Sequence, residues 1–147
     1  MTGFFLSFSV WETDANRMSY PQIPEDVRRF VLTSVPSVPF LESLLLLRAD
    51  PDQRWDSALL ASRLYISDRV AGELLEDLRT AGMARRCDAP HTHCYCYGPV
   101  SELLRDKIDL LADVYVSQLV EVTHLIHSTL ERKAQQFADA FRLRKDT

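Results

Sequence analysis

The spacing of apolar residues along this 147-residue chain changes from a helical period to an alternating one and back again. Before Gly82, apolar side chains recur three or four residues apart, as they do on one face of an α-helix. From Met83 to Asp88 and from His93 to Val100, the pattern suits two short strands joined by a turn. After Ser101 the helical period returns. The sequence therefore predicts a mainly α-helical fold with a small antiparallel β-ribbon.

Helices with recognisable start and stop signals are expected ahead of the ribbon. Asp56 or Ser57 can cap a short helix, and Ser67 can cap the longer helix that follows it. Gly82 suits the left-handed position that closes this longer helix. Trp55 is expected to pack in the core beside a leucine-rich helix. The expected helical ranges are 24–34, 38–49, 57–64 and 68–80.

The region after the ribbon carries an unusually wide apolar stripe. One long helix is expected from Ser101 to about His127, and a capping box at Ser128–Glu131 predicts a break and a final helix. A single small domain offers little surface to cover such a stripe, so burial against a second copy is predicted. The residues expected in this dimer interface are Leu104, Ile108, Leu111, Tyr115, Leu119, Val122, Ile126, Phe137 and Phe141.

These patterns divide the chain into three parts. We expect a loose N-terminal arm at 1–20, a compact domain at 21–100 and a helical dimerisation region at 101–147. The arm has no clean period, and the sequence leaves open whether Met1 or Met18 is the true start.

The cysteines and the absence of a long apolar run bear on location. No run reaches the roughly 20 apolar residues that a membrane span needs, so no membrane association is expected. No Lys or Arg precedes the apolar stretch from Phe4 to Trp11, which argues against a signal peptide. The three cysteines lie between Cys87 and Cys96, unlike an evenly spread disulfide framework. Reduced thiols in a cytoplasmic protein are therefore expected.

The order of the expected elements is helix, short strand, short helix, tight turn, longer helix and ribbon. Trp55 lies in the short strand, Tyr65-Ile66-Ser67 forms the turn, and Met83–Tyr97 forms the ribbon. From Leu41 to Tyr97, this order resembles winged helix-turn-helix bacterial transcriptional regulators in the style of the MarR and PadR families. The long helix after Ser101 also resembles those families, which dimerise through helices outside the DNA-binding domain.

The resemblance implies a sequence-specific transcriptional regulator that binds double-stranded DNA as a homodimer. The helix Asp68–Thr80 would enter the major groove, and the ribbon would touch the adjacent backbone or minor groove. Regulators of this type often bind a small-molecule effector as well, although no residue in this sequence indicates which effector that would be. The residues expected to contact DNA are Ser67, Arg69, Arg79, Arg85 and Arg86.

The charge of the chain departs from that pattern. The net charge is −4, whereas non-specific DNA binding depends mostly on neutralising phosphates. The expected turn Ala89–Thr92 holds no Lys or Arg. Between Ser67 and Thr80, two arginines stand against four carboxylates, which belong to Asp68, Glu73, Glu76 and Asp77. An alternative hypothesis is therefore a winged-helix protein-interaction module that has lost DNA binding.

Cysteine and histidine residues cluster in the expected ribbon. Their spacing matches no common zinc signature, so no metal or other cofactor is expected, and metal binding or thiol-redox sensing is the less favoured hypothesis. Cys94 and Cys96 are expected to lie buried beneath the ribbon, with Tyr95 and Tyr97 outside. The potential metal ligands are Cys87, His91, His93, Cys94 and Cys96.

The sequence shows no positive sign of an enzyme. It has four scattered glycines and no glycine-rich phosphate loop, and it lacks the nucleophile-elbow and paired-histidine helix patterns. His124 and His127 are three residues apart and could bind metal or sense pH. Such histidines more often end a helix favourably, which is the role expected of His127.

Overall fold

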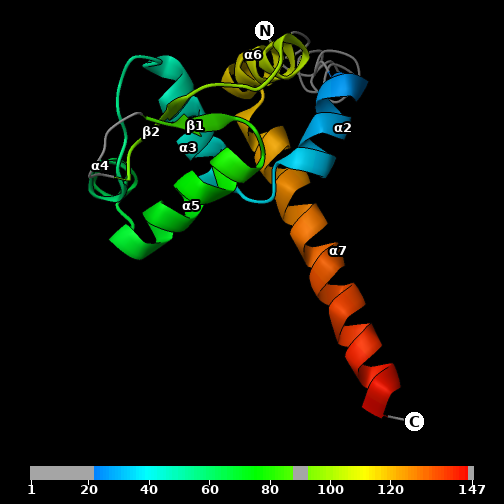
Figure 1. Ribbon diagram of the computed structural model, residues 1–147. Coiled ribbons are helices and arrows are strands. Elements are labelled where there is room, and N and C mark those ends of the chain that lie inside the picture. The colour runs from blue at the N-terminus through cyan, green and yellow to red at the C-terminus, as the bar shows by residue number, and fades with distance from the viewer. Residues whose placement is uncertain (1–21, 88–92, 146–147) are drawn as a thin grey trace, which may run out of the picture.

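The computed structural model describes residues 22–87 and 93–145, and the expected N-terminal arm, Met18 and the expected turn Ala89–Thr92 lie outside these ranges. The fold is mainly helical with a small antiparallel sheet, as the sequence predicts (Figure 1). The elements are α2 (Glu25–Ser34), α3 (Val38–Ala49), α4 (Ser57–Leu64), α5 (Asp68–Thr80), β1 (Ala84–Arg86), β2 (Tyr95–Tyr97), α6 (Glu102–Ser117) and α7 (Leu119–Lys145).

The caps at the start of the helices are those that the sequence indicates. The Asp56 side chain accepts a hydrogen bond from the Leu59 amide at 2.8 Å, and Ser67 Oγ accepts one from the Val70 amide at 3.2 Å. Each cap satisfies a backbone donor that the first helical turn leaves unpaired. Gly82 has φ of 76°, the left-handed value expected after α5. The two strands are shorter than expected, with three residues each.

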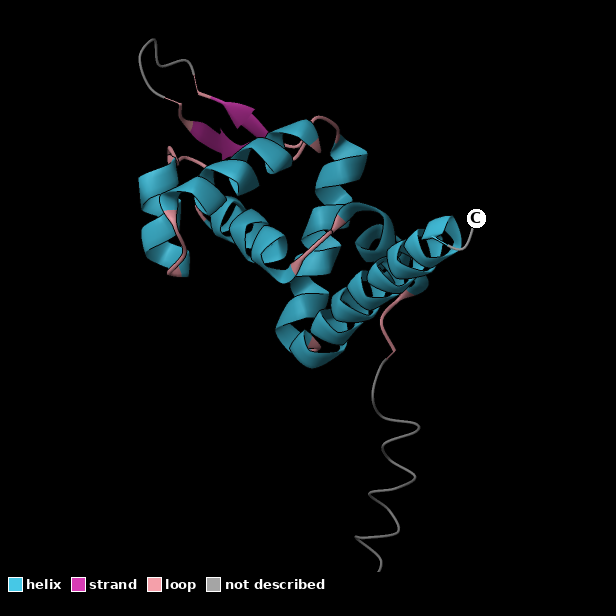
Figure 2. Ribbon diagram, turned by 90° about the horizontal axis from the view of Figure 1, so that it is seen from below, coloured by secondary structure: helices cyan, strands magenta, loops and turns pink. Residues whose placement is uncertain are grey.

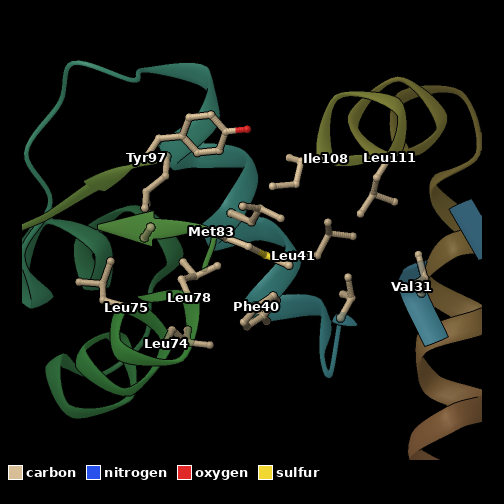
Figure 3. Close-up of a cluster of buried hydrophobic side chains, with 14 of the residues drawn as sticks. Val31, Phe40, Leu41, Leu74, Leu75, Leu78, Met83, Tyr97, Ile108 and Leu111 are labelled. Atoms are coloured by element: carbon tan, nitrogen blue, oxygen red, sulfur yellow. The ribbon is translucent and has the colours of Figure 1, made fainter. Parts of the chain in front are cut away.

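One hydrophobic core joins the helices on both sides of the ribbon. Leu41 of α3 is completely buried, and Figure 3 shows it between Met83 and the α6 residues Ile108 and Leu111. Trp55 is 2% exposed, which confirms its expected place in the core. Because α6 and the first part of α7 contribute to the same cluster, the core continues across residue 100.

The helix expected from Ser101 to His127 is wrong in its end points. The chain bends at Gln118, which has φ of −134° and ψ of 46°, and a new helix begins at Leu119. This bend lets Val114 before it and Val122 after it both reach the core, because the two helices can then lie at an angle to each other. The break expected at Ser128 is also wrong, because α7 runs through it to Lys145.

The C-terminal part of α7 extends away from the rest of the molecule (Figure 1). The first part of α7 packs against α2 and α6. Every residue from Leu130 to Arg144 is exposed, and we call this stretch the α7 arm. Figure 2 shows the two strands on one side of the molecule and the C-terminal end of α7 on the other.

Length and hydropathy of the helices also bear on membranes. No single helix in the described part of the chain is long and apolar enough to cross a bilayer. The pair α2 and α3 reaches that length together, but it is bent by 110° between the two helices.

Candidate nucleic-acid interface

The helices α4 and α5 pack together and are joined by only three residues. Tyr65 closes α4 in the left-handed conformation, with φ of 57°, and its side chain is 94% exposed. The inner side of α5 is buried through Ala71, Leu74, Leu75 and Leu78. Its outer side therefore faces solvent along its whole length, as a helix that enters a DNA groove must.

The two-stranded sheet packs on α5 through β1 and on α3 through β2. Ala84 pairs with Tyr97 and Arg86 with Tyr95 in an antiparallel register. Trp55 pairs with Tyr95 on the other side of β2, because each backbone amide donates to the other residue's carbonyl oxygen at 2.7 Å. A short extended segment around Trp55 thus pairs with the free edge of β2 through one antiparallel bridge.

The two ribbon tyrosines are buried, contrary to expectation. Tyr95 and Tyr97 are 6% and 7% exposed, and Cys94 and Cys96 are buried as expected. The strand alternation predicted one covered face and one exposed face. Both faces are covered here, because β1 packs on α5 and β2 packs on α3.

Four side chains from α5 and the ribbon meet at one carboxylate, and we call them the Glu76 cluster. Glu76 accepts hydrogen bonds from Arg79, through Nε at 3.0 Å and through Nη2, and from the Tyr95 hydroxyl at 2.8 Å. Arg86 Nη2 lies 3.6 Å from the second oxygen of the same carboxylate. The cluster therefore joins the C-terminal half of α5 to both strands.

The electrostatics of the Glu76 cluster follow from these contacts. The hydrogen bond from Arg79, with that from Tyr95, lowers the pKa of Glu76 from 4.5 to about 2. Burial, reinforced by the Glu76 carboxylate, raises the pKa of the Tyr95 hydroxyl. At neutral pH one carboxylate therefore offsets part of the charge of two arginines expected to serve DNA.

The other residues expected to contact DNA are spread along the same surface. Ser67 Oγ accepts the capping hydrogen bond, which leaves the hydroxyl proton available to an outside acceptor. Arg69 is exposed and forms an ion pair with Glu73 at 3.4 Å. Arg85 is exposed, and its aliphatic part lies against Gly98, where an added Cβ would come within 2.9 Å of it. Within the described residues, no ion pair is found for Arg85.

Sequence reasoning placed Glu76 only among the charges that oppose DNA binding. Its spacing of three residues from Arg79 could have indicated their helical ion pair. Its contacts with Arg86 and Tyr95 depend on how the ribbon packs on α5, which no local pattern encodes.

The cysteines differ from the expectation of reduced thiols. Cys87 and Cys94 form a disulfide, and Cys96 is free and buried. The pair is next to Arg86 and Tyr95 in the strand register, which is why their sulfurs can meet across the ribbon. His93 is exposed, and His91 lies outside the described residues. No cluster of three or more potential metal ligands occurs among the residues that the structure describes.

The residues expected at a dimer interface fall into three groups by their exposure in the single chain. Four of them are buried within a single copy of the chain, namely Ile108, Leu111, Val122 and Ile126. Ile108 and Leu111 enter the core from α6, whereas Val122 and Ile126 enter it from α7, after the bend at Gln118. Leu104 and Tyr115 are half-buried, and the exposed members are Leu119, Phe137 and Phe141.

A polar hollow of about 640 Å³ lies between the start of α2 and α7. Arg28, Glu121 and His124 line it together with Gln118, whose Oε1 is buried and has no hydrogen-bond partner among the described residues. The effector that the family resemblance implies stays a prediction. His127 does not end a helix as expected, because α7 continues for 18 residues to Lys145.

Comparison with known proteins adds little to this geometry. No protein-family model and no curated protein matches the chain. The crystal structure of RV1404 from Mycobacterium tuberculosis is similar, with 14% sequence identity, a TM-score of 0.44, and coverage of 90% of this chain and 80% of that chain. A likeness this loose supports no argument about function, so the site is interpreted from its own residues.

Proposed function

We propose that the chain is a winged helix-turn-helix transcriptional regulator that binds double-stranded DNA as a homodimer in the cytoplasm. In this proposal α5 enters the major groove, and the ribbon of β1 and β2 is the wing. The observation that carries it is the exposed outer side of α5 lying directly beside a ribbon that offers Arg85 and Arg86. No catalytic step and no cofactor are part of this function.

The roles of the arginines follow from their places. Arg69 stands in the first turn of α5, where side chains of a groove-binding helix usually reach base edges. Its ion pair with Glu73 is exposed, so a base or phosphate can replace it at little cost. Arg79 and Arg86 are held by Glu76 and serve phosphates only by sharing or leaving that carboxylate. Arg85 is free to contact the backbone directly.

The α7 arm is the proposed dimerisation element. Leu130, Ala134, Phe137 and Phe141 are spaced by four, three and four residues, so they form one apolar stripe along an exposed helix. Phe137 and Phe141 are 75% and 63% exposed in the single chain. Pairing of two arms would cover this stripe and join two copies of the chain, each with its own α5, as binding to a two-fold DNA site requires.

The protein-interaction alternative has its own supporting observation. Asp68, Glu73 and Asp77 are exposed on the outer side of α5, and Glu76 already occupies two of the nearby arginines. Such a surface repels phosphate and would suit a basic protein partner.

Binding to the DNA upstream of the protein's own gene separates these functions. Fluorescence polarisation with that DNA, against a random competitor and at two salt concentrations, should give specific binding that weakens as salt rises. Binding no better than to random DNA, even at low salt, would reject the regulator. Protein-interaction function then becomes the better account of the acidic surface.

A further inference from the structure

The Cys87–Cys94 disulfide links the two strands of the ribbon next to their last paired residues. Each strand of the ribbon has only three residues, and so short a hairpin depends on its neighbours for order. The Cys87 amide donates to the Cys94 carbonyl at 2.9 Å, so the disulfide joins two directly paired residues beyond the last strand pair. It therefore adds a covalent link at the end of the ribbon where β1 ends and β2 begins, next to the pair Arg86 and Tyr95.

The same disulfide adjoins the Glu76 cluster. Arg86 and Tyr95 are the neighbouring pair in the register, and both bind Glu76, at 3.6 Å and 2.8 Å. Movement of Cys87 and Cys94 apart would thus act on the two side chains that tie the ribbon to α5. A change in the bond between these two cysteines would therefore act first on residues of the proposed DNA-binding surface.

We propose that Cys87 and Cys94 form a reversible redox site that controls the order of the ribbon. Oxidation joins the two sulfurs and removes one proton and one electron from each thiol. Hydrogen peroxide accepts the two protons and two electrons and becomes two molecules of water, or a small disulfide accepts them and becomes two thiols. Disulfides that persist only under oxidation are typical of redox-sensing proteins in reducing compartments.

The two cysteines differ in exposure, and we expect this difference to set the route of reduction. Cys94 is 6% exposed, whereas Cys87 is half-buried. A reducing thiolate therefore attacks the Cys87 sulfur, forms a mixed disulfide there and releases the Cys94 thiolate. A second thiol then frees Cys87. Cys96, buried and unbonded, takes no part.

Thiol trapping on the full chain tests the site without any ligand. The protein is equilibrated in mixtures of reduced and oxidised glutathione, alkylated with N-ethylmaleimide and mapped by mass spectrometry. Cys87 and Cys94 should convert together, while Cys96 remains alkylatable after unfolding in every mixture. A pair that never oxidises, or that stays oxidised in excess reduced glutathione while folded, would overturn the proposal.

Amide hydrogen exchange tests the effect on the ribbon. Amides of β1 and β2 should exchange about tenfold more slowly in the oxidised protein, because the link resists local opening. Equal exchange in the two states would reject control of ribbon order. Cys87→Ser should show the fast exchange in every mixture, and Cys96→Ala should behave like the parent. Since reduced parent protein gives the same comparison, the test does not depend on how well Cys87→Ser folds.

The consequence for DNA rests on the proposed function. A pre-ordered ribbon loses less entropy on binding, so the oxidised protein should bind its upstream DNA about tenfold more tightly. Equal affinity of the two states would remove the regulatory role. If neither state binds DNA, the proposed function fails, while the exchange result still decides whether Cys87 and Cys94 control the ribbon.

Discussion

The hydroxyl of Tyr95 donates a 2.8 Å hydrogen bond to Glu76, and this contact links strand β2 to the C-terminal half of helix α5. Arg79 binds the same carboxylate from one side and Arg86 approaches it from the other. The Glu76 carboxylate therefore adds a polar link between helix and ribbon to the apolar packing of β1 on α5, and its charge state has measurable consequences.

Acid should weaken the fold through Glu76. The pKa of this carboxyl is about 2 in the folded chain against an ordinary 4.5, so its ionised form stabilises the fold above pH 4.5. That stabilisation is lost as the pH falls from 4.5 toward 2. Glu76→Gln should flatten this part of a curve of unfolding free energy against pH, measured by urea denaturation. Glu73→Gln, which removes a carboxylate from the same helix, is the matched control and should retain the parent slope.

The same substitution should strengthen DNA binding. Glu76→Gln removes one negative charge and releases Arg79 and Arg86 from their carboxylate. Affinity for DNA of any sequence should rise. The slope of log K against log salt should steepen by the amount that about one or two additional phosphate contacts contribute. Polarisation titrations at several salt concentrations measure both. An unchanged slope would place these two arginines away from the DNA.

Arg69 and Arg86 should affect DNA binding in different ways. Arg69→Ala should cost ~1–3 kcal/mol of binding free energy on the preferred sequence and relax specificity at one position. Arg86→Ala should weaken binding evenly across sequences and lower the salt slope by about one. Binding titrations on a set of single-base variants distinguish the two patterns. Identical profiles for both variants would contradict the assigned roles.

The α7 arm should determine the oligomeric state. Phe137→Asp places a charge in the exposed apolar stripe and should give monomers at micromolar concentration, where the parent chain gives dimers. Multi-angle light scattering reports the mass directly. Gln136→Asp adds the same charge beside the stripe, on another side of the arm, and should leave the dimer intact. A monomeric parent chain would remove the arm from the proposed function.

Gly82 should resist substitution more than Gly72 does. Alanine at Gly82 must adopt a φ of 76° and approach Val100 to 3.0 Å, so Gly82→Ala should cost about 1–2 kcal/mol of stability. At Gly72, inside α5, an added Cβ meets only the rotatable Ser57 hydroxyl, also at 3.0 Å. Higher helix propensity should offset that contact, so Gly72→Ala should be neutral or slightly stabilising. Urea midpoints of the two variants provide the comparison.

The sequence by itself determined the coarse fold class and, ahead of the ribbon, where the helices begin and end. The bounds of α3 and the caps Asp56 and Ser67 were predictable because capping and helical periodicity act within a few residues. The left-handed Gly82 was predictable for the same reason, whereas the burial of Trp55 was predictable from its large apolar side chain beside a leucine-rich helix.

Only the tertiary structure decided which apolar and polar groups meet. The bend at Gln118 and the unbroken α7 arise because Val114 and Val122 reach one shared core, and this packing outweighs the local capping signal at Ser128. The burial of Tyr95, its bond to Glu76 and the Cys87–Cys94 disulfide likewise depend on the ribbon's register and its packing on α3 and α5. Contacts between residues distant in sequence leave no periodic signal, so the pairing of Glu76 with Arg86 and Tyr95 emerged only from the folded chain.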